Sequence, residues 1–207
     1  MFITIFSLIV LLFSIVIHEV SHGEVAYRLG DPTAKYAGRL TLNPLKHLDL
    51  FGSLVLPLFL VITRSPFIIG WAKPVPINPY NFRDPKYGSA KVALAGPVAN
   101  LAIAIFFGLI LRFFPALVLP SSFTLMFSYI VYINILLAVF NLLPIPPLDG
   151  SHILFAFLPQ GLFQIKRFLQ QYGLLLLLLF LFFGLGFIEP LISFLYKLIT
   201  GSSFTIF

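Results

Sequence analysis

The first residues of the chain combine a long apolar run with a short cluster of polar side chains. The run from Phe2 to Ile17 contains no charged residue and leads into the stretch HEVSH, which holds His18, Glu19 and His22. A helix needs about 20 mainly apolar residues to cross a bilayer. Placing an ionisable group near the bilayer centre costs about 2.5 to 3.5 kcal/mol on insertion scales, so such groups generally serve a function. The combination predicts a membrane-spanning helix with a functional site near one end.

The spacing of the two histidines predicts a metal site. Residues four apart on a helix lie about 40° apart around the axis and one turn along it, so His18 and His22 point the same way and can bind one ion. Glu19 is rotated by about 100° from His18, which suits a base acting on water better than a third ligand. Two of the four histidines of the chain stand in this stretch. We therefore favour a metal site over a chance grouping of ordinary helix residues.

The composition indicates an integral membrane protein. Hydrophobic residues make up 59% of the chain and charged residues only 10%, whereas soluble proteins contain about 25% charged residues. The 207 residues allow about four to six membrane segments in one domain, 1–207. The net charge of +6 is spread over loops and fits anionic lipid rather than nucleic acid. Because the chain contains no cysteine, a metal must be bound by His, Asp or Glu.

Apolar segments and the breaks between them predict an all-α polytopic membrane protein. Gly30, Asp31 and Pro32 form a strong stop signal after the first span. The expected elements are core spans at about 2–29, 92–111 and 123–143, followed by C-terminal membrane segments at about 172–187 and 190–200 with a break at Glu189 and Pro190. The predicted fold is a three-helix core with additional C-terminal segments.

An insertion separates the first two core spans. Alternation over Tyr36 to Leu42 predicts a short strand, and the proline-rich stretch from Trp71 to Ile77 is expected to be extended. Segment 50–70 is apolar but interrupted by prolines, so it is either a full span or a re-entrant segment. Basic residues predominate on both sides of it, and a full crossing would place positive loops on both faces of the membrane. We favour a re-entrant or surface segment, with the HEVSH end facing the cytoplasm.

A third metal ligand has to come from elsewhere in the chain. Catalytic zinc takes three protein ligands and leaves one position for water. A third histidine in the common helical spacing would fall at Arg28, and Glu24 and Glu189 are poorly placed. Asp149 lies in NLLPIPPLDG, where prolines end a span and Asp-Gly forms a tight turn that can direct a carboxylate toward the first helix. His152 could share its face, but a fourth protein ligand would close the position for water.

Three motifs, HEVSHG, AGPVAN and FNLLPIPPLDG, occur in this order in apolar segments. Together they resemble the site-2 protease family of intramembrane zinc metalloproteases. The resemblance implies Zn²⁺ as cofactor, with His18, His22 and Asp149 as its ligands and Glu19 as the catalytic base. It also implies antiparallel first and second core spans, which favours a re-entrant segment 50–70. The chain is similar to the compact bacterial members, since no PDZ or CBS domain is evident.

The resemblance implies cleavage of a membrane-spanning protein or a remnant signal peptide in the lipid bilayer of the cell membrane. A helical substrate must unwind before cleavage, and Tyr36 to Leu42 and Trp71 to Ile77 are candidate edges for the unwound strand. Asn100 and Asn141 are candidate substrate-binding amides, with helix–helix hydrogen bonding as the alternative. A metal or ion transporter using the same His/His/Asp site is the competing interpretation. It requires a path of further polar residues, and the spans supply few.

Overall fold

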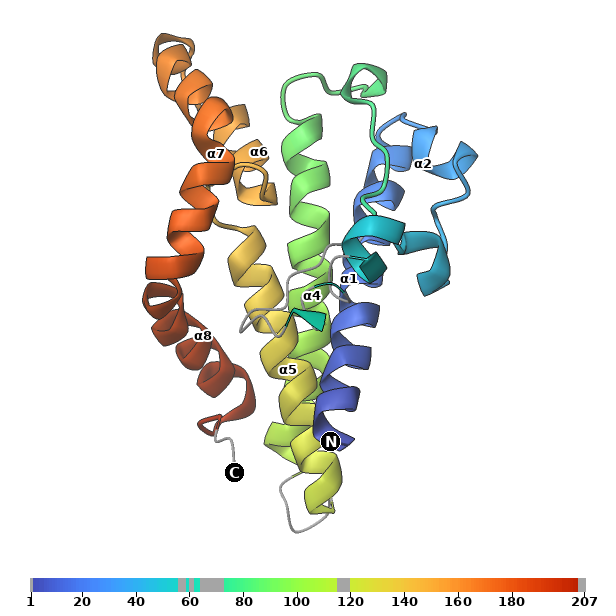
Figure 1. Ribbon diagram of the computed structural model, residues 1–207, viewed down its shortest axis with the longest axis vertical. Coiled ribbons are helices and arrows are strands. Elements are labelled where there is room, and N and C mark those ends of the chain that lie inside the picture. The colour runs from blue at the N-terminus through green and yellow to red at the C-terminus, as the bar shows by residue number, and fades with distance from the viewer. Residues whose placement is uncertain (1, 56–58, 60–61, 64–72, 115–119, 205–207) are drawn as a thin grey trace.

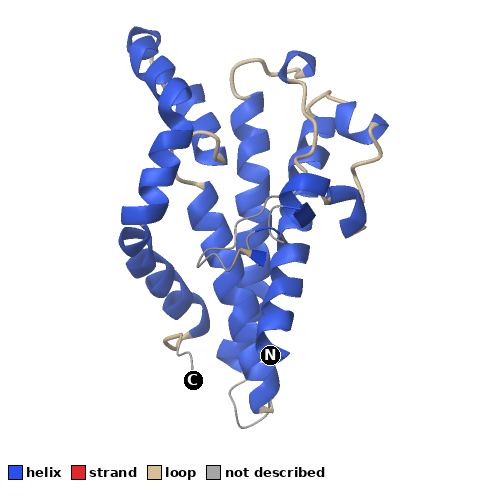
Figure 2. Ribbon diagram, in the orientation of Figure 1, coloured by secondary structure: helices blue, strands red, loops and turns tan. Residues whose placement is uncertain are grey.

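The computed structural model describes residues 2–55, 59, 62–63, 73–114 and 120–204 (Figure 1). Throughout these ranges the chain forms helices and loops without a strand (Figure 2). Four helices in them are long and apolar enough to cross a membrane: α1 (Phe2–Arg28), α4 (Gly88–Phe113), α5 (Ser121–Asn141) and α7 (Phe163–Phe183). The shorter helices are α2 (Thr33–Tyr36), η1 (Pro44–His47), η2 (Leu50–Val55), η3 (Pro79–Asn81), α6 (Asp149–Phe157), η4 (Gln160–Leu162) and α8 (Leu185–Thr200). The all-α polytopic prediction is confirmed, and α1, α4 and α5 agree with the three expected core spans within a few residues.

Helices α1, α4 and α5 lie side by side and alternate in direction (Figure 1). The C-terminal ends of α1 and α5 therefore lie at the same end of the molecule as the N-terminal end of α4. Helix α8 packs against α4 and α5 through an apolar cluster that includes Ala104, Val131, Ile135 and Ile192. This arrangement brings the ends of three helices together around the HEVSH stretch.

The prediction of a strand over Tyr36–Leu42 is wrong. The N–H groups of Gly38 and Arg39 donate to the carbonyls of Lys35 and Ala34, each at 3.0 Å, and so complete the end of helix α2. Gly38 also has a left-handed φ of 64°, a conformation that terminates helices and interrupts strands. The end of helix α2, and not the alternation of side chains, therefore determines the backbone conformation of this segment.

Most of segment 50–70 lies outside the described residues. Its first part forms the helical turn η2, Leu50–Val55. The choice between a full span and a re-entrant segment falls on residues outside the described ones. The second candidate edge, Trp71–Ile77, is described only from Lys73 onward. Lys73 to Ile77 has no regular secondary structure and leads into η3.

The C-terminal break lies at Gly184 instead of at Glu189 and Pro190. Helix α7 begins at Phe163, well before the expected start, and ends at Phe183, while Pro190 stands inside α8. A Cβ at position 184 would lie 2.3 Å from the ring of Phe180, so glycine allows the close turn there. Pro190 removes one intrahelical donor in the second turn of α8, and the helix continues through it.

Candidate metal centre

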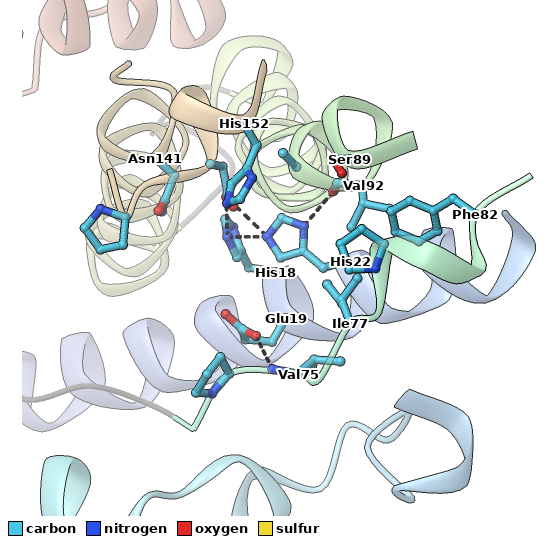
Figure 3. Close-up of a pocket in the computed structure, with 15 residues that line it drawn as sticks. His18, Glu19, His22, Val75, Ile77, Phe82, Ser89, Val92, Asn141 and His152 are labelled. Carbon is cyan, nitrogen blue, oxygen red and sulfur yellow. Dashed lines mark hydrogen bonds and ion pairs between the residues drawn. The ribbon is translucent and has the colours of Figure 1, made fainter. Parts of the chain in front are cut away.

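Helix α1 places the two histidines of the HEVSH stretch on one face. His18 and His22 are both buried, and their Nε2 atoms lie 3.0 Å apart with the rings at right angles. This is the convergence that the four-residue spacing predicts. The pair points toward the end of α5 and the start of α6 (Figure 3).

Asp149 brings a carboxylate from a distant part of the chain to the two imidazoles. Its Oδ2 lies 3.1 Å from His18 Nε2 and 3.2 Å from His22 Nε2. Gly150 makes this position accessible, because a Cβ there would lie 2.2 Å from the carbonyl oxygen of Leu142. The start of α6 can therefore pack directly on the end of α5. The sequence-predicted residues His18, His22 and Asp149 meet in one group with metal-ligand spacing.

The hydrogen bonds behind the imidazoles leave lone pairs facing the carboxylate. His22 Nδ1 lies 2.7 Å from the carbonyl oxygen of Val92, and His18 Nδ1 lies 2.7 Å from Asn100 Oδ1. Because an oxygen of this kind accepts, each Nδ1 carries the proton and each Nε2 is an acceptor in the neutral ring. Asp149 Oδ2 is buried and has no hydrogen-bond partner. Two imidazole nitrogens and one carboxylate oxygen, all with lone pairs, thus converge on one point. A bound cation would satisfy all three. The donor set fits zinc, which accepts imidazole nitrogen and carboxylate oxygen.

Gly96, in the AGPVAN motif on α4, gives the imidazoles their space. A Cβ at this position would lie 2.5 Å from His18 Nε2 and 2.6 Å from His22 Nε2. The sequence places Gly96 in an apolar segment, but it does not show that the neighbour of this glycine is the histidine pair. A glycine and proline in the middle of an apolar span were the available signal.

Glu19 lies in the same cavity but outside the three-ligand group (Figure 3). Its Oε2 accepts a hydrogen bond of 2.8 Å from the backbone N–H of Val75. That contact orients the carboxylate from the side of the insertion. Glu19 is thus placed beside the group of convergent ligand atoms without being part of it.

The cavity around these residues has a volume of about 340 Å³. The ligand group forms one side of it, the segment from Pro74 to Phe82 forms another, and Asn141 and His152 lie at its edge. His152 lines the cavity without joining the group of convergent ligand atoms. The cavity thus leaves open space beside a group formed by three protein side chains.

The two candidate substrate-binding asparagines occupy different places. Asn141 lines the cavity and donates to the carbonyl oxygen of Leu137. Asn100 is fully buried and is not among the cavity-lining residues. Its amide contacts His18, Ser14 and Asn134, so its groups are engaged within the protein. The structure therefore places the Asn100 amide against His18 and outside the cavity lining, whereas Asn141 is part of that lining.

Asp31 fastens the segment that carries Val75 to the end of α1. Its buried carboxylate accepts from the N–H of Asn78 at 2.7 Å, from Asn81 Nδ2 at 2.8 Å, and from the backbone and hydroxyl of Thr33. Burial raises the pKa of Asp31, but these hydrogen bonds outweigh it and hold the pKa below its usual value. The carboxylate is ionised at neutral pH and fixes one wall of the cavity.

Comparison with known proteins agrees with this centre. The model of Peptidase family M50 matches residues 116–181. The chain is 38% identical to "Putative zinc metalloprotease YwhC" of Bacillus subtilis, over 87% of this chain and 82% of that protein. It is 35% identical to "Putative zinc metalloprotease Rip2" of Mycolicibacterium smegmatis, over 67% of this chain and 52% of that protein. No solved structure matches the chain closely enough to count as a relative.

A multi-pass helical protein with a buried His/His/Asp group, and with relatives named as zinc metalloproteases, is a membrane metalloprotease that uses zinc. The chain belongs to Peptidase family M50, the site-2 protease family. The resemblance drawn from the three motifs is confirmed. The relatives' names do not favour the transporter interpretation.

Proposed function

We propose that His18, His22 and Asp149 bind the catalytic zinc, that Glu19 is the catalytic base, and that the substrate is a membrane-spanning protein or a remnant signal peptide. The observation that carries this proposal is the convergence of two Nε2 atoms and one carboxylate oxygen, with Glu19 in the same cavity. When bound, zinc polarises the scissile carbonyl and makes water a stronger acid.

Glu19 supplies the proton transfers that peptide hydrolysis needs. Its carboxylate takes a proton from the attacking water and returns it to the amine that leaves. The N–H of Val75 holds Oε2 at 2.8 Å, which limits the rotation of the side chain. Asn141, at the edge of the cavity, is positioned to donate to the substrate backbone.

The segment from Lys73 to Ile77 is our candidate for holding the unwound substrate. Three of its residues, Pro74, Val75 and Ile77, line the cavity. Arg39 Nη2 donates to the carbonyls of Lys73 and Pro74 at 2.6 and 3.3 Å, which fixes the start of the segment. A substrate strand laid along it would exchange its intrahelical hydrogen bonds for new backbone partners.

Substitution of the base tests the proposed chemistry. We expect Glu19→Gln in liposomes to keep zinc and to cleave single-span substrates about 10² to 10⁴ times more slowly, because a general base contributes that much. Glu24→Gln is the matched control, since Glu24 is on the same helix and pairs with Arg28 at the surface. Cleavage by Glu19→Gln at the wild-type rate would refute the role of Glu19.

We also propose that the metal centre faces the cytoplasm. Lys86 and Lys166 lie near the ends of α4 and α7 that share the metal end of the molecule, and basic loops are retained on the cytoplasmic side. Single cysteines at Lys73 and Lys166 should react with an impermeant reagent from the cytoplasmic face. A cysteine at Ser122, at the opposite end of the bundle, should react from the other face. If the cysteines introduced at Lys73 and Lys166 react from opposite faces, this topology is contradicted.

A further inference from the structure

A line of three buried polar side chains crosses the helical core behind the metal centre. Asn134 on α5, Asn100 on α4 and His18 on α1 are 0%, 0% and 7% exposed. Asn100 Nδ2 donates to Asn134 Oδ1 at 2.9 Å, and Asn100 Oδ1 lies 2.7 Å from His18 Nδ1. Buried amides in an apolar bundle are costly unless each group is paired. Every amide group in this line has a partner.

The direction of each hydrogen bond in the line follows from its far end. Asn134 Nδ2 donates at 2.9 Å to the backbone carbonyl of Ile130, which can only accept. The oxygen of Asn134 must therefore face Asn100, and Asn100 must present its NH₂ group to Asn134. The oxygen of Asn100 is then left for His18. The proton of His18 must consequently reside on Nδ1.

A second anchor fixes the same direction. Asn100 Nδ2 also donates to the backbone carbonyl of Ser14 at 3.3 Å. Two acceptors thus face one end of the Asn100 amide, and rotation of the amide by half a turn would place oxygen against both. The orientation of Asn100 is determined by two neighbouring helices, independently of any metal.

We propose that Asn134 and Asn100 are positioning residues that hold His18 as the Nδ1-protonated tautomer and so set the zinc affinity of the centre. This inference rests on the proposed role of His18 as a zinc ligand. A ligand histidine depends on the partner of its other ring nitrogen for tautomer and orientation. His22 receives the equivalent support from the backbone carbonyl of Val92, so side-chain substitution can change the support of only one of the two histidines.

Helix–helix adhesion is the competing role for the two amides, and it makes a different prediction. Hydrogen bonds between membrane helices contribute modestly to stability. If adhesion were their whole effect, substitution would lower the unfolding midpoint and leave the zinc affinity of the folded protein unchanged. A positioning role changes the zinc affinity and the ligand field of the bound metal.

The experiment measures zinc dissociation constants of folded, detergent-purified variants against a competing chelator, together with the visible spectrum of the Co²⁺-substituted protein. We expect Asn100→Leu to weaken zinc binding about 10- to 100-fold, as removal of such partners does in other zinc sites. Asn134→Leu should cause a smaller loss in the same direction and alter the Co²⁺ spectrum, although Asn134 does not line the metal cavity. Ser128→Ala is the matched control for zinc affinity, because Ser128 is also on α5, also donates to a carbonyl four residues back and does not line the metal cavity.

A further variant separates loss of the acceptor from loss of the fold. Asn134→Asp keeps an oxygen opposite the Asn100 amide, and we expect it to bind zinc more tightly than Asn134→Leu. Wild-type zinc affinity and spectrum in both Asn134 variants would overturn the inference, as would a loss of zinc affinity in Ser128→Ala equal to that in Asn134→Leu. If His18→Ala binds zinc as tightly as wild type, the proposed ligand set itself fails, and that result is distinct from a failure of the asparagine line.

Discussion

The core helices α1, α4 and α5 beside the metal centre and the C-terminal helix α7 are all apolar, yet they bury very different residues. Within the described residues, α7 buries only Gly173, and its leucine run is largely exposed. Helices α1, α4 and α5 instead bury small and polar residues, among them Ser14, Gly96, Asn100 and Asn134. In lipid, apolarity alone does not choose helix partners, whereas small residues permit close approach and polar groups give direction. The metal centre is built where these two features coincide.

The contrast is tested most strongly by adding a methyl group to a glycine beside the metal centre and to a glycine in the C-terminal helices. We expect Gly96→Ala to weaken zinc binding by more than about a hundredfold, because its Cβ would displace both imidazoles and even indirect disturbance of a zinc ligand costs about 10- to 100-fold. Gly186→Ala in α8 meets nothing within 4 Å and should leave zinc affinity unchanged. Competition with a chelator measures both, and similar affinities in the two variants would show that the core is less tightly packed than the structure has it.

Truncation of one apolar residue in each region should separate packing against protein from contact with lipid. Ile135 on α5 is 0% exposed and Leu178 on α7 is 42% exposed. We expect Ile135→Ala to lower the free energy of unfolding by about 2 kcal/mol or more, since it leaves a cavity, and Leu178→Ala to lower it by clearly less. Unfolding of both variants in mixed detergent micelles provides the measurement. An equal loss would mean that α7 is buried against a further surface.

The smallest of these effects concerns Asp31, which joins the insertion to α1. Removing a charged hydrogen-bond acceptor costs about 1.5 to 3 kcal/mol, so Asp31→Asn should be less stable than wild type by about that amount at pH 7. The folded pKa lies below the ordinary 3.8, so this stabilisation is complete above pH 3.8 and is lost as the pH falls through the folded value. Thermal unfolding of both proteins from pH 7 to 3 should show the difference narrowing. A constant difference would exclude the charge of Asp31 as its source.

The apolar segments of the sequence predicted the three long helices α1, α4 and α5. The i, i+4 spacing predicted that His18 and His22 converge. Both are local properties of a helix. The predictions that failed are those in which two local signals conflict. At Gly38 a helix ends where side-chain alternation had predicted a strand. The C-terminal helices are separated at Gly184, whereas the break had been predicted at Pro190. The contacts that Gly96, Val92 and Asn134 make around the histidines could not be predicted, because they depend on which helix faces pack against one another. The position of Asp149 was predictable only because few other ligands were available.

The central claim is that one zinc ion is bound by His18, His22 and Asp149, and zinc stoichiometry of purified variants tests it most directly. Asp84→Asn is the matched control, because Asp84 forms an ion pair with Lys91 away from the cavity. We predict one zinc per chain in the wild type and in Asp84→Asn, and loss of zinc in Asp149→Asn, whose side chain is a much poorer ligand. A full complement of zinc in Asp149→Asn would contradict the account.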